Sequence, residues 1–321
     1  MWGGRRLERL GKALPDGVMV GESWEVADLA TTSPSGGGGG AARSVIANGP
    51  SAGATIHQAV AAWGSALLGE GWADSADFPL LVKLLDAREH LSVQVHPTPA
   101  YAARHPGAHV KTESWYVIDA ALDAVLYFGL EPGVTRDDVL AAIPADRVAD
   151  LLRAVPAAAG DCHHLPSGTI HALGAGVLVA EFQSPSDTTF RFYDWAREYD
   201  RTPRQLHVAE ALEAMTYDPP PPPARAATGA PITRLVASAR YDLYETRLAP
   251  GSTFALDPGA CTVVMTISGH MELAAGGVPL DLGAGATVVV PAATPPALHA
   301  GSDGVVALVA RLGSAAGASE T

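Results

Sequence analysis

Apolar and polar residues alternate in the stretch LSVQVH, near the end of the first third of the chain. A strand turns successive side chains to opposite faces, so Val93 and Val95 share one face while Gln94 and His96 share the other. A second strand is expected in the following segment KTESWY, where Glu113 contributes a carboxylate. The pattern therefore predicts two strands that supply an amide, an imidazole and a carboxylate to one site.

Helical periodicity is present in three other segments, at 55–72, 133–159 and 203–215. In the second of these, Thr135 and Asp138 have the spacing of a capping box at the start of a helix. We interpret 133–159 as a small helical insertion or flap.

Strand patterns dominate the rest of the sequence. A continuous apolar run at 78–85, FPLLVKLL, predicts a buried strand. Short strands with Gly-rich turns between them are predicted in the C-terminal part at Ile232–Ala237, Tyr241–Leu248, Cys261–Ser268, Thr287–Pro291 and Val305–Arg311. Such a series is typical of a sandwich or jelly-roll barrel, and the fold class is predicted to be mainly β.

The predicted domain boundaries follow from these patterns and from composition. A first domain is expected over 1–217 and a second over 232–313, with a Pro-rich linker, DPPPPP and its surroundings, at 218–231. The loop SPSGGGGGAA at 33–42 is expected to be flexible, and the tail 314–321 is expected to be disordered.

Composition and charge narrow the function classes. The chain has 321 residues and a net charge of −13, which argues against nucleic acid and anionic membranes as partners. The only cysteines, Cys162 and Cys261, form neither a disulfide framework nor a thiolate metal site, and a cytoplasmic location is the simplest interpretation.

Of 21 basic residues three are lysines, and Lys83 and Lys111 lie next to the motif strands. Their positions suggest a need for an ammonium group, since arginine is not equivalent to it.

A fourth metal-binding side chain is offered by His171, in the segment LPSGTIHALG. Together with Gln94, His96 and Glu113 it forms a set that suits Zn²⁺ at a site with room for water or substrate oxygens. Each residue has a simpler explanation alone, because Glu113 could pair with Lys111 and a single histidine is more often structural. The remaining histidines are interpreted as surface or structural, with at most one of His163 and His164 able to share a site; the others are His57, His90, His105, His109, His207, His270 and His299.

Seven blocks, in order, resemble the type I mannose-6-phosphate isomerases of the short bacterial kind: WGGRRLERLGK, GESWEVAD, SVIANGP, LVKLLDAREHLSVQVHP, KTESWY, PSGTIHALG and TTFRFYDWAR. The resemblance covers nearly the whole chain. That family consists of zinc enzymes of the cupin superfamily, so it implies two cupin (jelly-roll) barrels. It also implies an interconversion of mannose 6-phosphate and fructose 6-phosphate through an enediol. Three departures are Thr98 and Pro99, where the family has acidic residues, an inserted SPSGGGGG loop, and a family strand before the WGG block that is either missing here or lies ahead of the start of this sequence.

The resemblance also implies roles for individual residues. One zinc ion would be held by Gln94, His96, Glu113 and His171. Arg191 matches the active-site arginine, Lys111 an acid/base or substrate contact, Glu181 a further acidic position, and Ser92 and Lys83 positions that line the substrate site. The proton carrier is left open between Lys111 and Glu181. The second barrel is expected to lack metal, and a monomer is expected.

Two alternatives are set against the isomerase. Another metal-dependent cupin enzyme, such as a dioxygenase, would favour iron with a facial triad. A non-catalytic sugar- or metal-binding module would keep the ligands without the activity. The presence of Lys111, Glu181 and Arg191 argues against loss of activity, and a glutamine ligand beside cationic residues fits a sugar phosphate better than dioxygen chemistry.

Overall fold

Strands provide most of the secondary structure in the computed structural model, which describes residues 2–32, 39–72, 74–256, 258–275, 278–294 and 297–313. Most of the expected flexible loop, residues 33–38, and the expected disordered tail, 314–321, lie outside the described residues. The chain divides into two units. The first comprises Met1–Arg5, Met19–Glu22 and Leu84–Pro223, and the second comprises Arg6–Val18, Ser23–Lys83 and Ala224–Thr321. Both units are therefore assembled from segments that are distant in sequence.

The first unit contains two antiparallel sheets. One has the strand order β4-β11-β6-β9 and the other has the order β12-β5-β10-β7-β8. The strands are β4 (Leu81–Ala87, in this unit from Leu84), β5 (Val93–Val95), β6 (Glu113–Ala120), β7 (Val125–Leu130), β8 (Leu152–Pro156), β9 (Asp161–Leu165), β10 (His171–Leu173), β11 (Val177–Gln183) and β12 (Phe190–Tyr193). The helical segments are α3 (Pro99–Ala102), α4 (Arg136–Ala142), the 3₁₀ turn η3 (Val148–Leu151) and α5 (Val208–Ala214).

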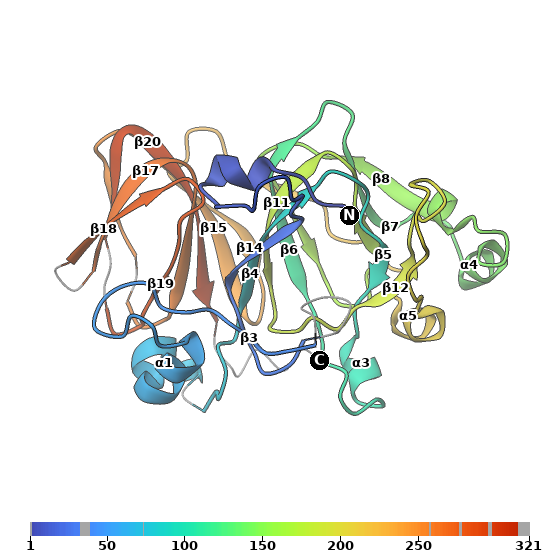
Figure 1. Ribbon diagram of the computed structural model, residues 1–321, viewed down its shortest axis with the longest axis horizontal. Coiled ribbons are helices and arrows are strands. Elements are labelled where there is room, and N and C mark those ends of the chain that lie inside the picture. Colours follow the sequence, from blue (N-terminus) through green and yellow to red (C-terminus); the bar gives the residue numbers. More distant parts are fainter. Residues whose placement is uncertain are drawn as a thin grey trace. The chain divides into compact units, whose positions relative to one another are not determined.

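Two apolar clusters hold these sheets in place. One lies between the sheets and joins Trp115 and Val179 to Phe128 and Leu173. The other lies on the outer face of the β5 sheet, where Val93, Val95 and Phe192 pack against residues of α4 and α5, and α5 lies beside β12 (Figure 1). Since Val93 and Val95 belong to the outer cluster, the alternation predicted for this strand turns Gln94 toward the space between the sheets.

The second unit is organised around one sheet with the order β14-β15-β20-β17-β18; β16 also pairs with β20, and β19 with β17. Its strands are β1 (Glu22–Val26, in this unit from Ser23), β2 (Asp28–Leu29), β3 (Ala42–Arg43), β13 (Ala224–Arg225), β14 (Ile232–Ala237), β15 (Tyr241–Leu248), β16 (Thr253–Ala255), β17 (Thr262–Ala275), β18 (Val278–Gly283), β19 (Thr287–Val290) and β20 (Ala297–Leu312). Its helical segments are η1 (Arg6–Leu10), α1 (Ile56–Trp63), α2 (Ser65–Leu68) and η2 (Glu70–Trp72).

The predicted helices are present but shorter than their periodicity suggested. The segment 55–72 is interrupted at Gly64 and Gly69, whose positive φ angles end α1 and α2. In 133–159 the capping box of Thr135 and Asp138 is confirmed, yet the helix ends after one short element and the chain continues into β8. In 203–215 only α5 is helical.

The long strands β17 and β20 exceed the predicted ones because bulges let them bend. The pairing of the two strands shifts register between Thr266 and Ser268 and again between Gly269 and Met271. Gly269 has a φ of 77°, and a Cβ atom there would lie 2.1 Å from the carbonyl oxygen of Gly304. This position therefore requires glycine. No helix among the described residues is both long and apolar enough to cross a bilayer.

Candidate metal centre

Strand register places three predicted site residues side by side in the first unit. Gln94 on β5 is paired with His171 on β10 and, on its other side, with Arg191 on β12. Directly paired residues of antiparallel strands project to the same face of a sheet. His171 and Arg191 are buried, and Gln94 is half-buried. The sheet thus builds a row of imidazole, amide and guanidinium groups.

The carboxylate of Glu113, at the start of β6, joins two of the predicted histidines. Its Oε1 lies 3.1 Å from His171 Nε2, and its Oε2 lies 3.3 Å from His96 Nε2. The Lys111 ammonium lies 2.9 Å from Oε2. All four side chains are buried. His96, Glu113 and His171 therefore form a group of three ligand atoms close enough to hold one metal ion.

The protonation of the two histidines fits such an ion. Their Nδ1 atoms lie 3.1 Å and 2.7 Å from the carbonyl oxygens of Thr188 and Thr169 respectively. A carbonyl only accepts, so each Nδ1 carries the proton and each Nε2 presents a lone pair. Burial and the nearby Lys111 ammonium lower the pKa of His96 to about 3, which keeps its ring neutral.

Three ligand atoms of this group make no hydrogen bond among the described residues: His96 Nε2, His171 Nε2 and Glu113 Oε1. Two imidazole lone pairs facing one carboxylate are satisfied by a cation between them, and imidazoles held through Nδ1 to backbone carbonyls are the usual ligands of zinc. The donor set therefore fits a zinc ion.

Lys111 and Glu181, the candidates for proton transfer, differ in their surroundings. Burial opposes the charged form of Lys111, but Glu113 and Glu181 outweigh it and raise the pKa of the ammonium. Glu181, on β11, accepts a hydrogen bond of 2.8 Å from Trp115 Nε1 and is buried. Both groups reach the same region, because the Glu181 charge acts on Lys111.

Ser92 and Lys83, the predicted substrate contacts, belong to different units. Ser92 is buried just before β5. Lys83 is buried in the part of β4 that belongs to the second unit, where its Nζ lies 4.5 Å from the centre of the Trp24 ring.

A second group of potential ligands lies in the second unit, at a histidine that the sequence did not single out. His57 Nδ1 is 3.3 Å from both Asp28 Oδ2 and Asp77 Oδ1. Asp28 also contacts Arg43 Nε at 3.3 Å and accepts a hydrogen bond from the Phe78 amide. A guanidinium already balances the buried carboxylate, so we interpret this group as a structural network.

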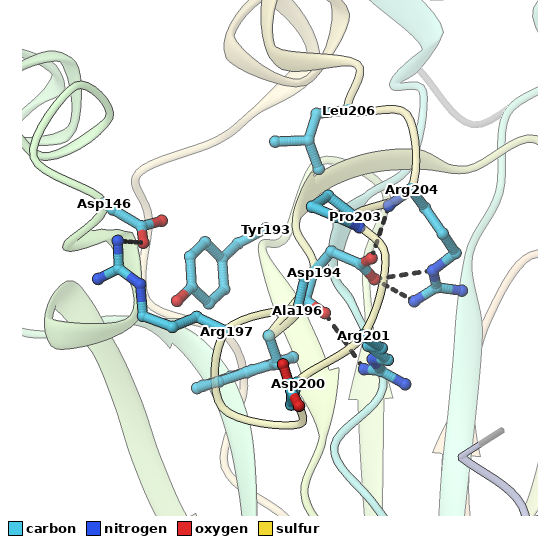
Figure 2. A pocket seen from close by; sticks show the side chains of 11 residues that line it. Asp146, Tyr193, Asp194, Ala196, Arg197, Asp200, Arg201, Pro203, Arg204 and Leu206 are labelled. Atoms are coloured by element: carbon cyan, nitrogen blue, oxygen red, sulfur yellow. Dashed lines mark hydrogen bonds and ion pairs between the residues drawn. The ribbon is translucent and has the colours of Figure 1, made fainter.

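Sequence reasoning also missed Asp194, whose buried carboxylate lies three residues after Arg191. It lines a pocket of about 400 Å³ together with Arg197, Arg201 and Arg204 (Figure 2). None of the three ligand residues lines this pocket. The signal was present in the segment FRFYDW, but a single aspartate in a strand gave no reason to pair it with an arginine ten residues later.

Comparison with known proteins shows the family to which the chain belongs. A family model described as "Phosphomannose isomerase type I, catalytic domain" matches residues 37–121. Mannose-6-phosphate isomerase of Streptococcus mutans is 34% identical over 281 residues, which cover 86% of this chain and 84% of the relative. The chain belongs to the type I mannose-6-phosphate isomerase family. A probable mannose-6-phosphate isomerase of Bacillus subtilis is 35% identical over 301 residues, covering 91% and 90% of the two chains.

Solved structures of mannose-6-phosphate isomerases confirm the mainly β fold. The crystal structure of the enzyme from Bacillus subtilis matches with a TM-score of 0.81 and 29% identity, covering 97% of this chain and 95% of that one. A putative mannosephosphate isomerase of Archaeoglobus fulgidus matches in fold, with a TM-score of 0.72 and 19% identity over 97% of this chain and 93% of that one.

Proposed function

We propose that this member of the mannose-6-phosphate isomerase family is an active, zinc-dependent enzyme that interconverts mannose 6-phosphate and fructose 6-phosphate. The proposal rests on one observation: His96 Nε2 and His171 Nε2 both lie close to the Glu113 carboxylate, and all three residues are buried. We assign the fourth ligand to Gln94, because it is paired in register with His171.

The reaction moves a proton between C1 and C2 of the sugar through an enediol. Zinc at this site supplies Lewis acidity toward a sugar oxygen. The buried Arg191 guanidinium offers a fixed positive charge on the same face of the sheet, suited to the oxyanion that develops in the transition state. Such a charge is effective because a buried cation held in place needs no reorientation during the reaction.

Proton transfer is assigned to Lys111 and Glu181 acting in the same region. The Lys111 ammonium, whose pKa Glu113 and Glu181 raise, is assigned the donating role. Glu181, whose carboxylate is held by a hydrogen bond from Trp115 Nε1, is assigned the accepting role. Glu181→Gln and Lys111→Met should therefore each lower kcat, while Ser92→Ala and Lys83→Met, at the proposed substrate contacts, should chiefly raise KM.

Chelation tests reaction, substrate and metal together. A coupled assay follows fructose 6-phosphate formed from mannose 6-phosphate before dialysis against a chelator, after it, and after zinc is returned. Activity should disappear with the metal and return with zinc, with metal content measured by mass spectrometry. Full activity in verified metal-free protein contradicts zinc dependence, and iron with oxygen uptake would indicate the alternative enzyme class.

We propose a cytoplasmic location for the enzyme. Among the described residues neither Cys162 nor Cys261 forms a disulfide, and both are buried, which fits a reducing cytoplasm. We also propose that the protein acts as a monomer on its small-molecule substrate.

A further inference from the structure

Arg191 is held by a short segment that follows it in the chain, residues 204–207. Its backbone N–H donates to His207 Nδ1 at 3.2 Å, and its carbonyl accepts from the His207 N–H at 2.7 Å. Its Nη1 donates to the carbonyl oxygen of Gln205 at 2.9 Å. The position of the guanidinium therefore depends on where this segment lies.

Asp194 fixes the start of that segment. Its Oδ2 accepts the backbone N–H of Arg204 at 3.0 Å, and its Oδ1 accepts Arg204 Nε at 2.8 Å and also contacts Arg204 Nη2 (Figure 2). Asp194 is 5% exposed. Burial alone would raise the pKa of Asp194, but the hydrogen bonds from Arg204 outweigh it and hold that pKa below its usual range. The carboxylate is thus a buried anion with most of its acceptor capacity directed at one arginine.

The Oδ1 atom of Asp194 also faces Arg191. Asp194 Oδ1 lies 4.0 Å from Arg191 Nε, a buried nitrogen without a hydrogen-bond partner among the described residues. Asp194 therefore lies between two guanidinium groups of like charge, Arg191 and Arg204. Without its negative charge, Arg204 would repel Arg191, and the 204–207 segment would lose its anchor.

Backbone geometry supports this arrangement. The pairing of β12 with β5 shifts register between Arg191 and Tyr193, so that a bulge separates the arginine from the rest of the strand. Trp195, directly after Asp194, has a φ of 48°, and its Nε1 donates to the Leu91 carbonyl at 2.8 Å. A non-glycine residue in this region is strained, and such strain is kept where the surrounding structure imposes it.

We propose that Asp194 is a positioning residue for the isomerase reaction, holding the Arg191 guanidinium in place both by its charge and by anchoring residues 204–207 through Arg204. This inference rests on the proposed function, in which Arg191 stabilises the transition state. It adds a charged series, the buried Arg191 and Asp194 and the half-exposed Arg204, that connects the catalytic face of β12 to the neighbouring pocket wall.

The test is a double-mutant cycle with a matched control. Asp194→Asn removes the charge at constant size and should lower kcat about 10- to 100-fold with a smaller change in KM, at unchanged zinc content. Added to Arg191→Ala, the same substitution should lower kcat no further, because the group it positions is gone. The control is Asp146→Asn, which breaks an exposed pair with Arg197 (2.9 Å) in the same pocket and should leave kcat unchanged.

Several results would overturn the proposal. One is a double variant whose kcat loss equals the product of the losses of Asp194→Asn and Arg191→Ala alone, because independent effects indicate that Asp194 has a general structural role. Another is an unchanged kcat in folded, zinc-loaded Asp194→Asn protein. If that variant does not fold, Asp194→Asn combined with Arg204→Gln removes both charges and enters the same cycle. Wild-type turnover of mannose 6-phosphate tests the proposed function separately.

A crystal structure of Asp194→Asn tests the proposal independently of activity. It should show the Arg191 guanidinium displaced while His96, Glu113 and His171 keep their positions. An undisplaced guanidinium would also overturn the proposal.

Discussion

The two units contain similar antiparallel sheets with different interiors. In the first, a row across neighbouring strands reads Arg191, Gln94, His171. In the second, a row across β15, β20 and β17 reads Thr246, Ala307, Thr266. The first row contains groups that bind metals and anions, whereas the second contains small side chains beside an apolar cluster that includes Val264. Chemistry in this protein therefore depends on which residues occupy paired positions, and a β-sheet architecture alone does not produce it.

Histidine shows the same contrast. In the first unit two imidazoles present lone pairs to Glu113. In the second, His299 on β20 is paired with the exposed Glu272 of β17, and its Nδ1 lies 2.9 Å from Thr253 Oγ1 at the surface. His299 and Glu272 are therefore paired in register like the residues of the first unit, but they lack the burial and the second imidazole that His96, Glu113 and His171 have. The expectation that the second barrel lacks metal stays a prediction.

Removing a proposed ligand should have the largest effect. His171→Ala should abolish zinc binding and lower kcat/KM about 1,000-fold, because Lewis-acid stabilisation contributes several kcal/mol. Metal analysis and the coupled assay measure both quantities. His105→Ala, at an exposed histidine stacked on Tyr101, is the control and should keep zinc and activity. Retained stoichiometric zinc in the His171 variant would show that the first row is not a metal site.

Arg191→Ala should have the next largest effect. It removes the fixed cation of the first row and should lower kcat about 100- to 1,000-fold while zinc content stays at the wild-type level. Steady-state kinetics and metal analysis on the same preparation separate the two. Loss of zinc along with activity would make Arg191 a structural support of the ligands.

Acidification should distinguish the two units by stability. In β9, burial lowers the pKa of His163, and burial lowers the pKa of His164 from 6.5 to about 4. Below about pH 6.5 the unfolded state therefore binds more protons than the folded state, so the stability present above that pH is lost progressively toward pH 4. The described histidines of the second unit, His57, His270 and His299, are at least partly exposed.

Hydrogen exchange at pH 7 and pH 5, corrected for the intrinsic rate, should show β9 losing protection before β17 and β20. His163→Phe, which removes a titrating ring packed edge-on against Phe128, should reduce the difference. Equal loss of protection in both units would contradict the assignment of the acid sensitivity to His163 and His164.

The smallest effect is expected in the second row. The Thr246 hydroxyl is buried, with no hydrogen-bond partner among the described residues. Thr246→Val should raise the free energy of unfolding by up to about 1 kcal/mol, since an unsatisfied buried polar group is destabilising. Urea denaturation measures the change, and isomerase activity should not change. A clear loss of stability would reveal a partner for this hydroxyl and a more polar interior.

Local patterns predicted elements well and assembly less well. The strands Ile232–Ala237 and Tyr241–Leu248 were predicted at their observed bounds, and alternation correctly placed Val93 and Val95 on one face. The pairing of β5 with β10, which brings His171 to Gln94, joins distant segments, and only the chemistry of the donor set and the family resemblance pointed to their proximity. Periodicity also gave no indication that segments 6–18 and 23–83 group with the C-terminal strands. Such grouping depends on packing between distant elements, which no short window of sequence contains.

The carbonyl oxygens of Thr169 and Thr188 hold the Nδ1 atoms of His171 and His96. Because these acceptors belong to the main chain, a side-chain substitution at either threonine leaves them in place. The tautomer that presents both Nε2 lone pairs to Glu113 is therefore protected from substitutions at these two threonines, so the proposed ligand geometry does not depend on which side chains they carry.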